Sequence, residues 1–204
     1  MSSLSRTPSM TAAAPLDLSR RSPAFKTAAV LAGSLFLTLC SYIQVPMVPV
    51  PVTLQTFGVL LVGALFGWRL GALTILAWFG EAAIGLPVLA GGKSGWIAFV
   101  GPTAGYLFSY PLCAALAGWW VEKRWRRRLP LAFTGMALAS LLCLASGAAW
   151  LSLSIGLEKA IALGVTPFLL GDLLKSALVA VSLKLIAESV ETRRRGRQDD
   201  QGQA

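Results

Sequence analysis

Long apolar stretches, separated by short polar or Pro/Gly-rich segments, dominate the chain. Six of them predict helices, at about residues 27–43, 53–67, 71–86, 102–121, 131–156 and 166–188. The stretch at 53–67 is short, because a helix that spans a bilayer takes about 20 residues. The pattern therefore predicts an all-α fold, that of an integral membrane protein with six transmembrane helices.

Two segments between these stretches are predicted to be non-helical. Residues 45–52 hold three prolines, which remove backbone donors and bias the preceding residues to extended conformations. Residues 87–101 are rich in glycine and predict a loop or a re-entrant segment. Irregular backbone at membrane depth is tolerated only where it is buried in protein or lines a cavity. Both segments are therefore expected to cap a pocket that the helices at 102–121, 131–156 and 166–188 build.

The distribution of basic residues predicts the orientation. If the six helices alternate in direction, all but four of the 18 Lys and Arg residues fall on one face or its flanking tails; the four are Lys93, Lys159, Lys175 and Lys184. The positive-inside rule then places both termini in the cytoplasm. Residues 1–25 are expected to be a flexible cytoplasmic tail, 26–190 a six-helix membrane domain, and 191–204 a charged, disordered cytoplasmic tail.

Composition supports a bilayer as the solvent. Hydrophobic residues make up 55% of the chain, charged residues 13%, and the mean hydropathy is +0.68, whereas soluble domains carry about 25% charged residues. The net charge of +9 lies in short clusters between apolar stretches, and no nucleic-acid motif accompanies it. The expected surroundings are a lipid bilayer, a bacterial cytoplasmic membrane crossed several times, and nucleic acid is excluded as a partner.

Catalytic chemistry has little support in the sequence. The chain has no His, which removes His-based acid–base catalysis and His-ligated metals. Gly92-Lys93-Ser94 imitates the end of a phosphate-binding loop, but the required earlier glycine is Pro87. We expect no catalytic residue, no metal, no cofactor and no ATPase activity. The cysteines are expected to be small buried hydrophobes; they are Cys40, Cys113 and Cys143.

One pair of charges stands inside the last apolar stretch. Asp172 and Lys175 are three residues apart, so they share a helical face, at roughly 9 and 13 Å from Thr166. Each costs about 2.5–3.5 kcal/mol near a helix centre, which favours a polar ligand or cavity beside them. An ion pair that locks two helices together is the alternative. Thr53 and Gln55 add uncharged donors and acceptors nearby, although Thr53 is equally suited to be an N-cap.

Four stretches, in order, are similar to a known family. They are Val48–Thr56, Gly85–Gly92, Gly101–Tyr106 and Pro167–Lys175. This set resembles BioY, the family of biotin-binding S components of energy-coupling factor transporters, over about residues 27–188. The resemblance implies six helices, an outward-facing biotin pocket, and Asp172 and Lys175 as ligand contacts.

The resemblance also implies which loop residues border the pocket. They come from the glycine-rich segment and from the Gly101–Tyr106 motif, and include Gly91, Gly101, Thr103 and Tyr106. Lys93 either meets the biotin carboxylate or is solvated. Tyr106 or Trp96 is expected to stack against the ligand ring. Gln55 and Thr53 complete the predicted set.

The implied partners are a transmembrane coupling protein and ATPase subunits, which energise transport. They are expected to dock on helix 27–43, where Ala28 and Ala32 form a small-residue face. Three alternatives remain open from the residues: an S component for another vitamin such as riboflavin or thiamine, a stand-alone membrane transporter, and a structural subunit.

Overall fold

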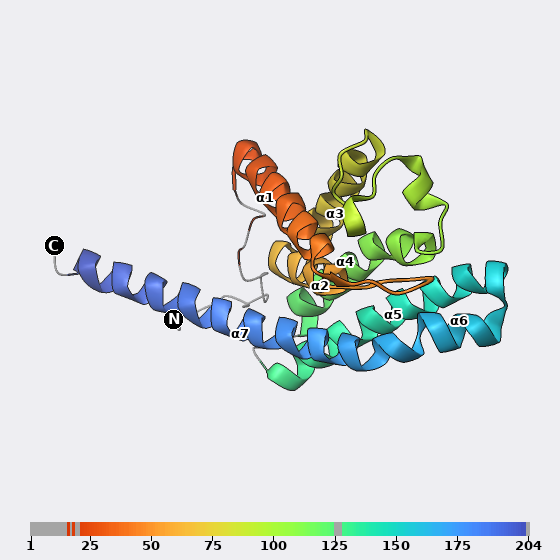
Figure 1. Cartoon of the computed structure of the whole chain (residues 1–204). Coiled ribbons are helices and arrows are strands. Elements are labelled where there is room, and N and C mark those ends of the chain that lie inside the picture. The colour runs from red at the N-terminus through yellow and green to blue at the C-terminus, as the bar shows by residue number, and fades with distance from the viewer. Residues whose placement is uncertain (1–15, 17, 19–20, 125–127, 203–204) are drawn as a thin grey trace, which may run out of the picture.

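The computed structural model is almost wholly helical (Figure 1), and it describes residues 16, 18, 21–124 and 128–202. Seven α-helices occur in this part of the chain. They are α1 (Pro23–Tyr42), α2 (Gln55–Phe66), α3 (Trp68–Ala83), α4 (Ala104–Arg124), α5 (Leu129–Ile155), α6 (Leu157–Gly164) and α7 (Thr166–Gly202). The all-α prediction is confirmed. Most of the predicted flexible tail at 1–25 lies outside the described residues.

The helix starts differ from the predicted ones for local reasons. α1 begins at Pro23, within the predicted tail, because Ser22 caps it by accepting a 3.4 Å hydrogen bond from the Phe25 amide. Serine followed by proline is a strong start signal for a helix. α6 was not predicted at all. Gly156, with φ +83, ends α5 and lets the chain turn directly into this eight-residue helix.

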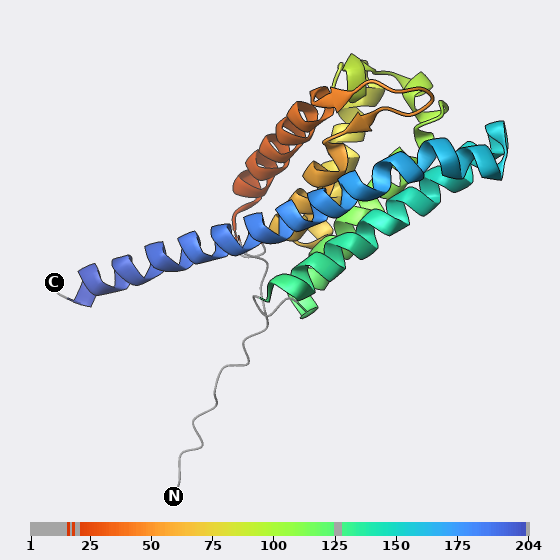
Figure 2. The same ribbon diagram turned by 60° about the horizontal axis from the view of Figure 1, so that its bottom comes forward.

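α7 is longer than the prediction, which ended it at residue 188. Its backbone stays helical to Gly202, so the expectation of a disordered segment from residue 191 differs from the structure. Half of the added residues are Glu, Arg or Gln, which are good helix formers, and none is proline. The 37-residue helix is about 55 Å long, and its C-terminal half projects away from the other helices in Figures 1 and 2.

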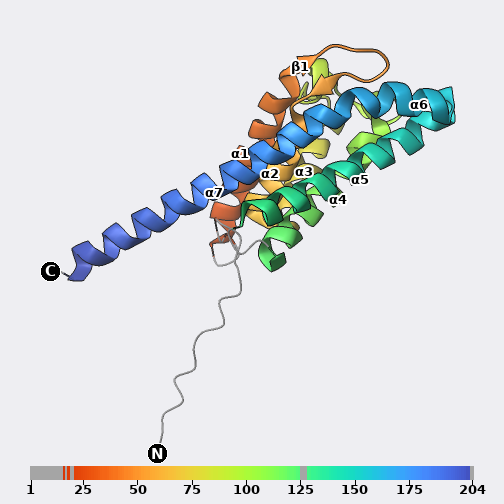
Figure 3. The ribbon, with the colours of Figure 1, turned by 90° about the horizontal axis from the view of Figure 1, so that it is seen from below.

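The two segments predicted to be non-helical contain little helix. The first forms a hairpin in which β1 (Gln44–Val45) pairs antiparallel with β2 (Val52–Thr53). The second contains only two short 3₁₀ turns, η2 (Ala90–Gly92) and η3 (Trp96–Phe99). In Figure 3 the hairpin lies at the same end of the molecule as the α5–α6–α7 turn. The second segment lies beside the hairpin, since Gly91 passes close to Gln44, so both segments gather at one end of the helices.

α7 exposes leucine and buries a charged pair, the reverse of what a soluble protein does. On α7, Leu170 is 70% exposed, whereas Asp172 and Lys175 are 4% and 8% exposed. Apolar side chains on an outer surface and polar ones inside are what a lipid solvent favours. By length and composition, two helices in the described part are able to cross a membrane, α1 and α5, and α2 is a shorter apolar helix.

Candidate functional site

A cavity lies between the hairpin, the segment between α3 and α4, and the helices α2, α4, α5 and α7. About 620 Å³ of empty space lies within it, including the open solvent at its mouth. Its lining residues are Val50, Pro51, Thr53, Gln55, Thr56, Leu89, Ala90, Lys93, Ala98, Thr103, Tyr106, Leu107, Tyr110, Cys143, Leu144, Phe168 and Asp172. The wall is mainly apolar, with a few polar groups.

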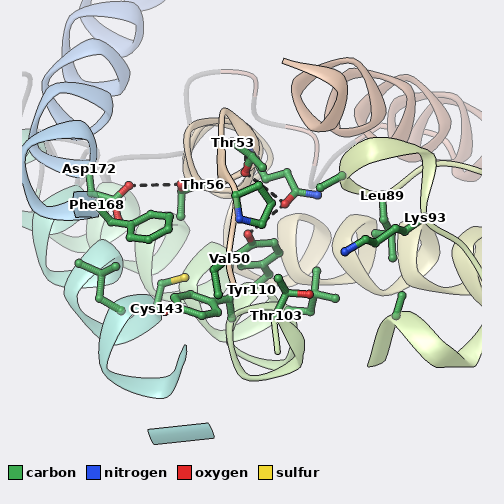
Figure 4. Close-up of a pocket in the computed structure, with 17 residues that line it drawn as sticks. Val50, Thr53, Thr56, Leu89, Lys93, Thr103, Tyr110, Cys143, Phe168 and Asp172 are labelled. Atoms are coloured by element: carbon green, nitrogen blue, oxygen red, sulfur yellow. Dashed lines mark hydrogen bonds between the residues drawn. The ribbon is translucent and has the colours of Figure 1, made fainter. Parts of the chain in front are cut away.

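Asp172 supplies the buried charge of the cavity wall (Figure 4). Its Oδ1 accepts a 2.9 Å hydrogen bond from Lys175 Nζ, and Lys175 Nζ also donates to Thr56 Oγ1 at 3.1 Å. Thr56 Oγ1 donates to the same Asp172 oxygen at 3.4 Å. The predicted shared face of Asp172 and Lys175 is confirmed. The residues that line the cavity include Asp172 but not Lys175, which lies behind the carboxylate.

A second polar group surrounds Gln55 at the start of α2. Its Oε1 accepts hydrogen bonds from Thr53 Oγ1 at 3.2 Å and from Tyr110 Oη at 3.3 Å. Its Nε2 donates to Ser41 Oγ on α1 at 3.0 Å. Thr53 Oγ1 also accepts from the Gln55 amide at 3.3 Å, and Thr53 lines the cavity. The N-cap of α2 is Leu54, so the alternative that Thr53 is the N-cap is wrong.

Tyr106 lines the cavity with its ring and uses its hydroxyl elsewhere. The ring centroid lies 6.2 Å from that of Phe168. The hydroxyl donates a 2.6 Å hydrogen bond to the carbonyl of Gly164, at the turn between α6 and α7. Trp96, the other residue considered for stacking, is 75% exposed and does not line the cavity. The aromatic wall is therefore built from Tyr106, Phe168 and Tyr110.

The loop residues divide into two groups. Lys93 and Thr103 line the cavity, and Figure 4 shows Lys93 across the cavity from Asp172. Gly91 and Gly101 do not line it. Gly91, with φ +69, passes close to Gln44 of the hairpin, where a side chain would approach the Gln44 amide. The carbonyl of Gly101 accepts a 3.1 Å hydrogen bond from Trp150 Nε1 on α5.

Several lining residues were missed from the sequence. Phe168 and Asp172 are four residues apart on α7, and Tyr106 and Tyr110 are four apart on α4, so each pair shares a helical face. That spacing was a signal for Phe168 and Tyr110. Thr56 closed the motif Val48–Thr56 without being singled out. The cysteines are buried and free, as predicted, and Cys143 also lines the cavity.

An apolar exterior around a cavity with a buried carboxylate is the arrangement typical of a membrane protein with a small-molecule site. Comparison with known proteins makes the class specific. The BioY family model matches residues 10–192. The chain belongs to the BioY family, which confirms the resemblance seen in the sequence.

Individual relatives and a solved structure agree. The chain is 36% identical over 151 residues to a probable biotin transporter BioY of Pyrococcus horikoshii, covering 72% of this chain and 89% of the relative. It is 39% identical over 163 residues to the biotin transporter BioY of Rhodobacter capsulatus, covering 71% and 84%. These relatives are named as transporters and not as enzymes, in agreement with the prediction.

The fold is similar to that in a crystal structure of the S-component for biotin from an ECF-type ABC transporter. The TM-score is 0.67 at 25% sequence identity, and the match covers 82% of this chain and 95% of that chain. The protein is thus a membrane-embedded member of a transporter family.

Proposed function

We propose that this chain captures biotin in the cavity, as the substrate-binding S component of an energy-coupling factor transporter. The observation that carries the proposal is Asp172, a buried carboxylate that lines a mainly apolar cavity in a chain whose relatives are named biotin transporters. An ionised carboxylate only accepts hydrogen bonds. The ureido group of biotin offers two N–H donors, which is the complement that Asp172 requires.

The other walls of the cavity suit the rest of the ligand. The apolar thiophane ring of biotin fits against the rings of Tyr106 and Phe168. Its carboxylate then extends towards Lys93, on the opposite side from Asp172. Uncharged donors and acceptors line the space between, from Thr53, Gln55 and Thr103. Lys175 contributes to binding by holding Asp172 in place. Gly91 and Gly101 contribute by shaping the segment between α3 and α4.

Calorimetry of the purified full chain tests this proposal. We expect heat of binding with biotin at micromolar concentration. Asp172→Asn should weaken binding by about 10- to 150-fold, because a hydrogen bond to a charged group contributes about 1.5–3 kcal/mol. Glu158→Gln is the control, since Glu158 is an exposed acid of α6 that does not line the cavity, and its affinity should match the wild type.

The variant Asp172→Asn leaves the buried charge of Lys175 without an opposite charge beside it, which can itself destabilise a protein by several kcal/mol. The double variant Asp172→Asn/Lys175→Met removes both charges and should fold while still binding biotin weakly. If the double variant bound biotin as tightly as the wild type, the Asp172–Lys175 pair would have a structural role only and would not bind the ligand. Absence of heat with biotin would refute the proposal, and heat with riboflavin or thiamine instead would assign the chain to another vitamin.

The proposed topology has six spans, α1 to α5 and α7, with both termini in the cytoplasm of a bacterial cell. α2 has 12 residues and is about 18 Å long, short of the roughly 30 Å hydrocarbon core. The hairpin before it is proposed to supply the remaining depth; Val50 of this hairpin is buried, whereas Val45 and Val48 are exposed. Glu158→Cys should react with a membrane-impermeant maleimide in intact cells, and Lys123→Cys should not. The reverse labelling would invert the orientation.

Separate coupling and ATPase subunits are proposed to dock on α1. Ala28 and Ala32 are exposed on this helix, whereas Gly33 and Ser34 face the bundle. Small residues four apart let another helix approach closely. Ala32→Trp should abolish co-purification with these subunits and leave biotin binding unchanged. Leu76→Trp, at an exposed site of α3, is the control; assembly that tolerates Ala32→Trp would place the docking surface elsewhere.

A further inference from the structure

Three buried polar side chains connect α2 to α7 beside the cavity. Thr56 comes from α2, and Asp172 and Lys175 come from α7; they are 8%, 4% and 8% exposed. Each contacts the other two, at 2.9 Å from Lys175 to Asp172, 3.1 Å from Lys175 to Thr56, and 3.4 Å from Thr56 to Asp172. The threonine hydroxyl therefore closes a triangle with the pair.

The direction of each hydrogen bond in this triangle is fixed by chemistry. A lysine ammonium only donates, so the Thr56 hydroxyl accepts from Lys175 Nζ. A hydroxyl has one proton, and the Thr56 proton then points to Asp172 Oδ1. Both hydrogen bonds to the carboxylate end at Oδ1. Among the residues that the structure describes, none donates to Oδ2, the other oxygen of this cavity-lining group.

We infer that Thr56 is a positioning residue for the ligand: it holds Oδ1 of Asp172 on the protein side and leaves Oδ2 as the acceptor for a ligand N–H. The inference rests on the proposed function. It specifies which chemical group of the ligand binds beside Asp172. An ionised carboxylate with one free oxygen accepts a hydrogen bond from a neutral donor, such as the N–H of a cyclic urea. It repels a carboxylate or a phosphate.

Thr56 is not needed to hold α7 in place. Ser140 of α5 and Ser176 of α7 share a 3.2 Å hydrogen bond directly beside Lys175. Farther along α7, Val179 and Leu183 are fully buried. Removal of the Thr56 hydroxyl should therefore leave the fold intact while freeing the carboxylate to rotate. An effect on binding without an effect on stability distinguishes positioning from packing.

The test compares Thr56→Val, which keeps the shape and loses the hydroxyl, with Thr56→Ser, which keeps the hydroxyl. We expect Thr56→Val to weaken biotin binding by about five- to twentyfold, the range for one buried hydrogen bond, and Thr56→Ser to stay within about twofold. Thr74→Val is the matched control, since Thr74 is fully buried in α3 and donates only to Leu70 of its own helix. It should bind as the wild type does.

A biotin analogue methylated on its ureido nitrogens provides the decisive readout. It has no N–H to offer Asp172, so Thr56→Val should bind it as the wild type does if Thr56 acts through the carboxylate. A loss that is equal for biotin and the analogue, or no loss for biotin, would overturn the inference. Absence of biotin binding by the wild type would instead refute the proposed function, so the two failures are distinguishable.

Discussion

The two ends of α2 are packed in opposite ways. At the N-terminal end, Gln55 and Thr56 reach α1, α4 and α7 through side-chain hydrogen bonds and border the cavity. At the C-terminal end, Gly63 lies directly against the backbones of α3 and α4, and the cavity does not extend to it. One helix therefore has a polar, hollow end and a dry, close-packed end.

The close packing depends on glycines that meet backbone atoms. A Cβ on Gly63 would lie 2.7 Å from Ala114 Cα, and one on Gly71 would lie 2.7 Å from Gly63 Cα. One on Gly118 would lie 2.6 Å from the Gly63 carbonyl oxygen. This part of the bundle closes the molecule below the cavity. The difference between the ends teaches that the helix has two separate tasks: its polar side chains border the cavity, and backbone contacts close the bundle beyond the cavity.

The largest expected effect comes from a substitution at the close-packed end of α2. Gly63→Ala should lower the thermal midpoint in detergent by about 5–10 °C, because overpacking costs about 1–3 kcal/mol and backbone cannot move aside cheaply. Biotin affinity of the folded protein should stay within about twofold, since the site is remote. The measurements are thermal unfolding and calorimetry of the same preparation.

Gly80→Ala is the matched control for this substitution. Gly80 also lies in a helix, but a Cβ there meets nothing within 4 Å. Alanine should keep or slightly raise the midpoint, because glycine is about 1 kcal/mol less favourable than alanine in a helix interior. If both variants behaved alike, the packing argument would be wrong.

A smaller effect separates the two functions of Tyr106 at the hollow end. Tyr106→Leu removes the ring from the cavity wall and should weaken biotin binding about tenfold, as expected for the loss of an aromatic contact and its buried area. Tyr106→Phe keeps the ring and loses only the hydrogen bond to Gly164. It should bind biotin within about twofold of the wild type and lose about 1 kcal/mol of stability. If the two variants bound biotin with equal affinity, the Tyr106 ring would not contact the ligand.

The sequence predicted the elements with strong local signals. The proline run at 45–52 excluded helix, and Asp172 and Lys175 shared a face because helical geometry places i and i+3 together. Thr56 was missed because a hydroxyl in an apolar helix is common, and its partner Asp172 is 116 residues away. The end of α7 was misjudged because charged residues suit both a disordered tail and an exposed helix.

The close-packed end of α2 was beyond sequence reasoning for a related reason. Gly63, Gly71 and Gly118 lie on three different helices, so their mutual contact depends on tertiary packing alone. Glu81 was equally unassigned from the sequence. In the structure it accepts a 2.7 Å hydrogen bond from Ser34, which joins α3 to α1. Long-range pairs of this kind have no local periodicity to reveal them.

The smallest expected effect concerns Lys93, at the opposite side of the hollow end from Asp172. This side chain is exposed, and exposed ion pairs contribute only about 0.2–1 kcal/mol. Lys93→Gln should therefore weaken biotin binding by about two- to fivefold, and the difference should shrink as salt is raised. The amide of biotin, which lacks the carboxylate, should bind both forms equally. A loss as large as that of Asp172→Asn, or one that persists with the amide, would mean that Lys93 shapes the loop instead of meeting the carboxylate, and that the ligand's charged end lies elsewhere in the cavity.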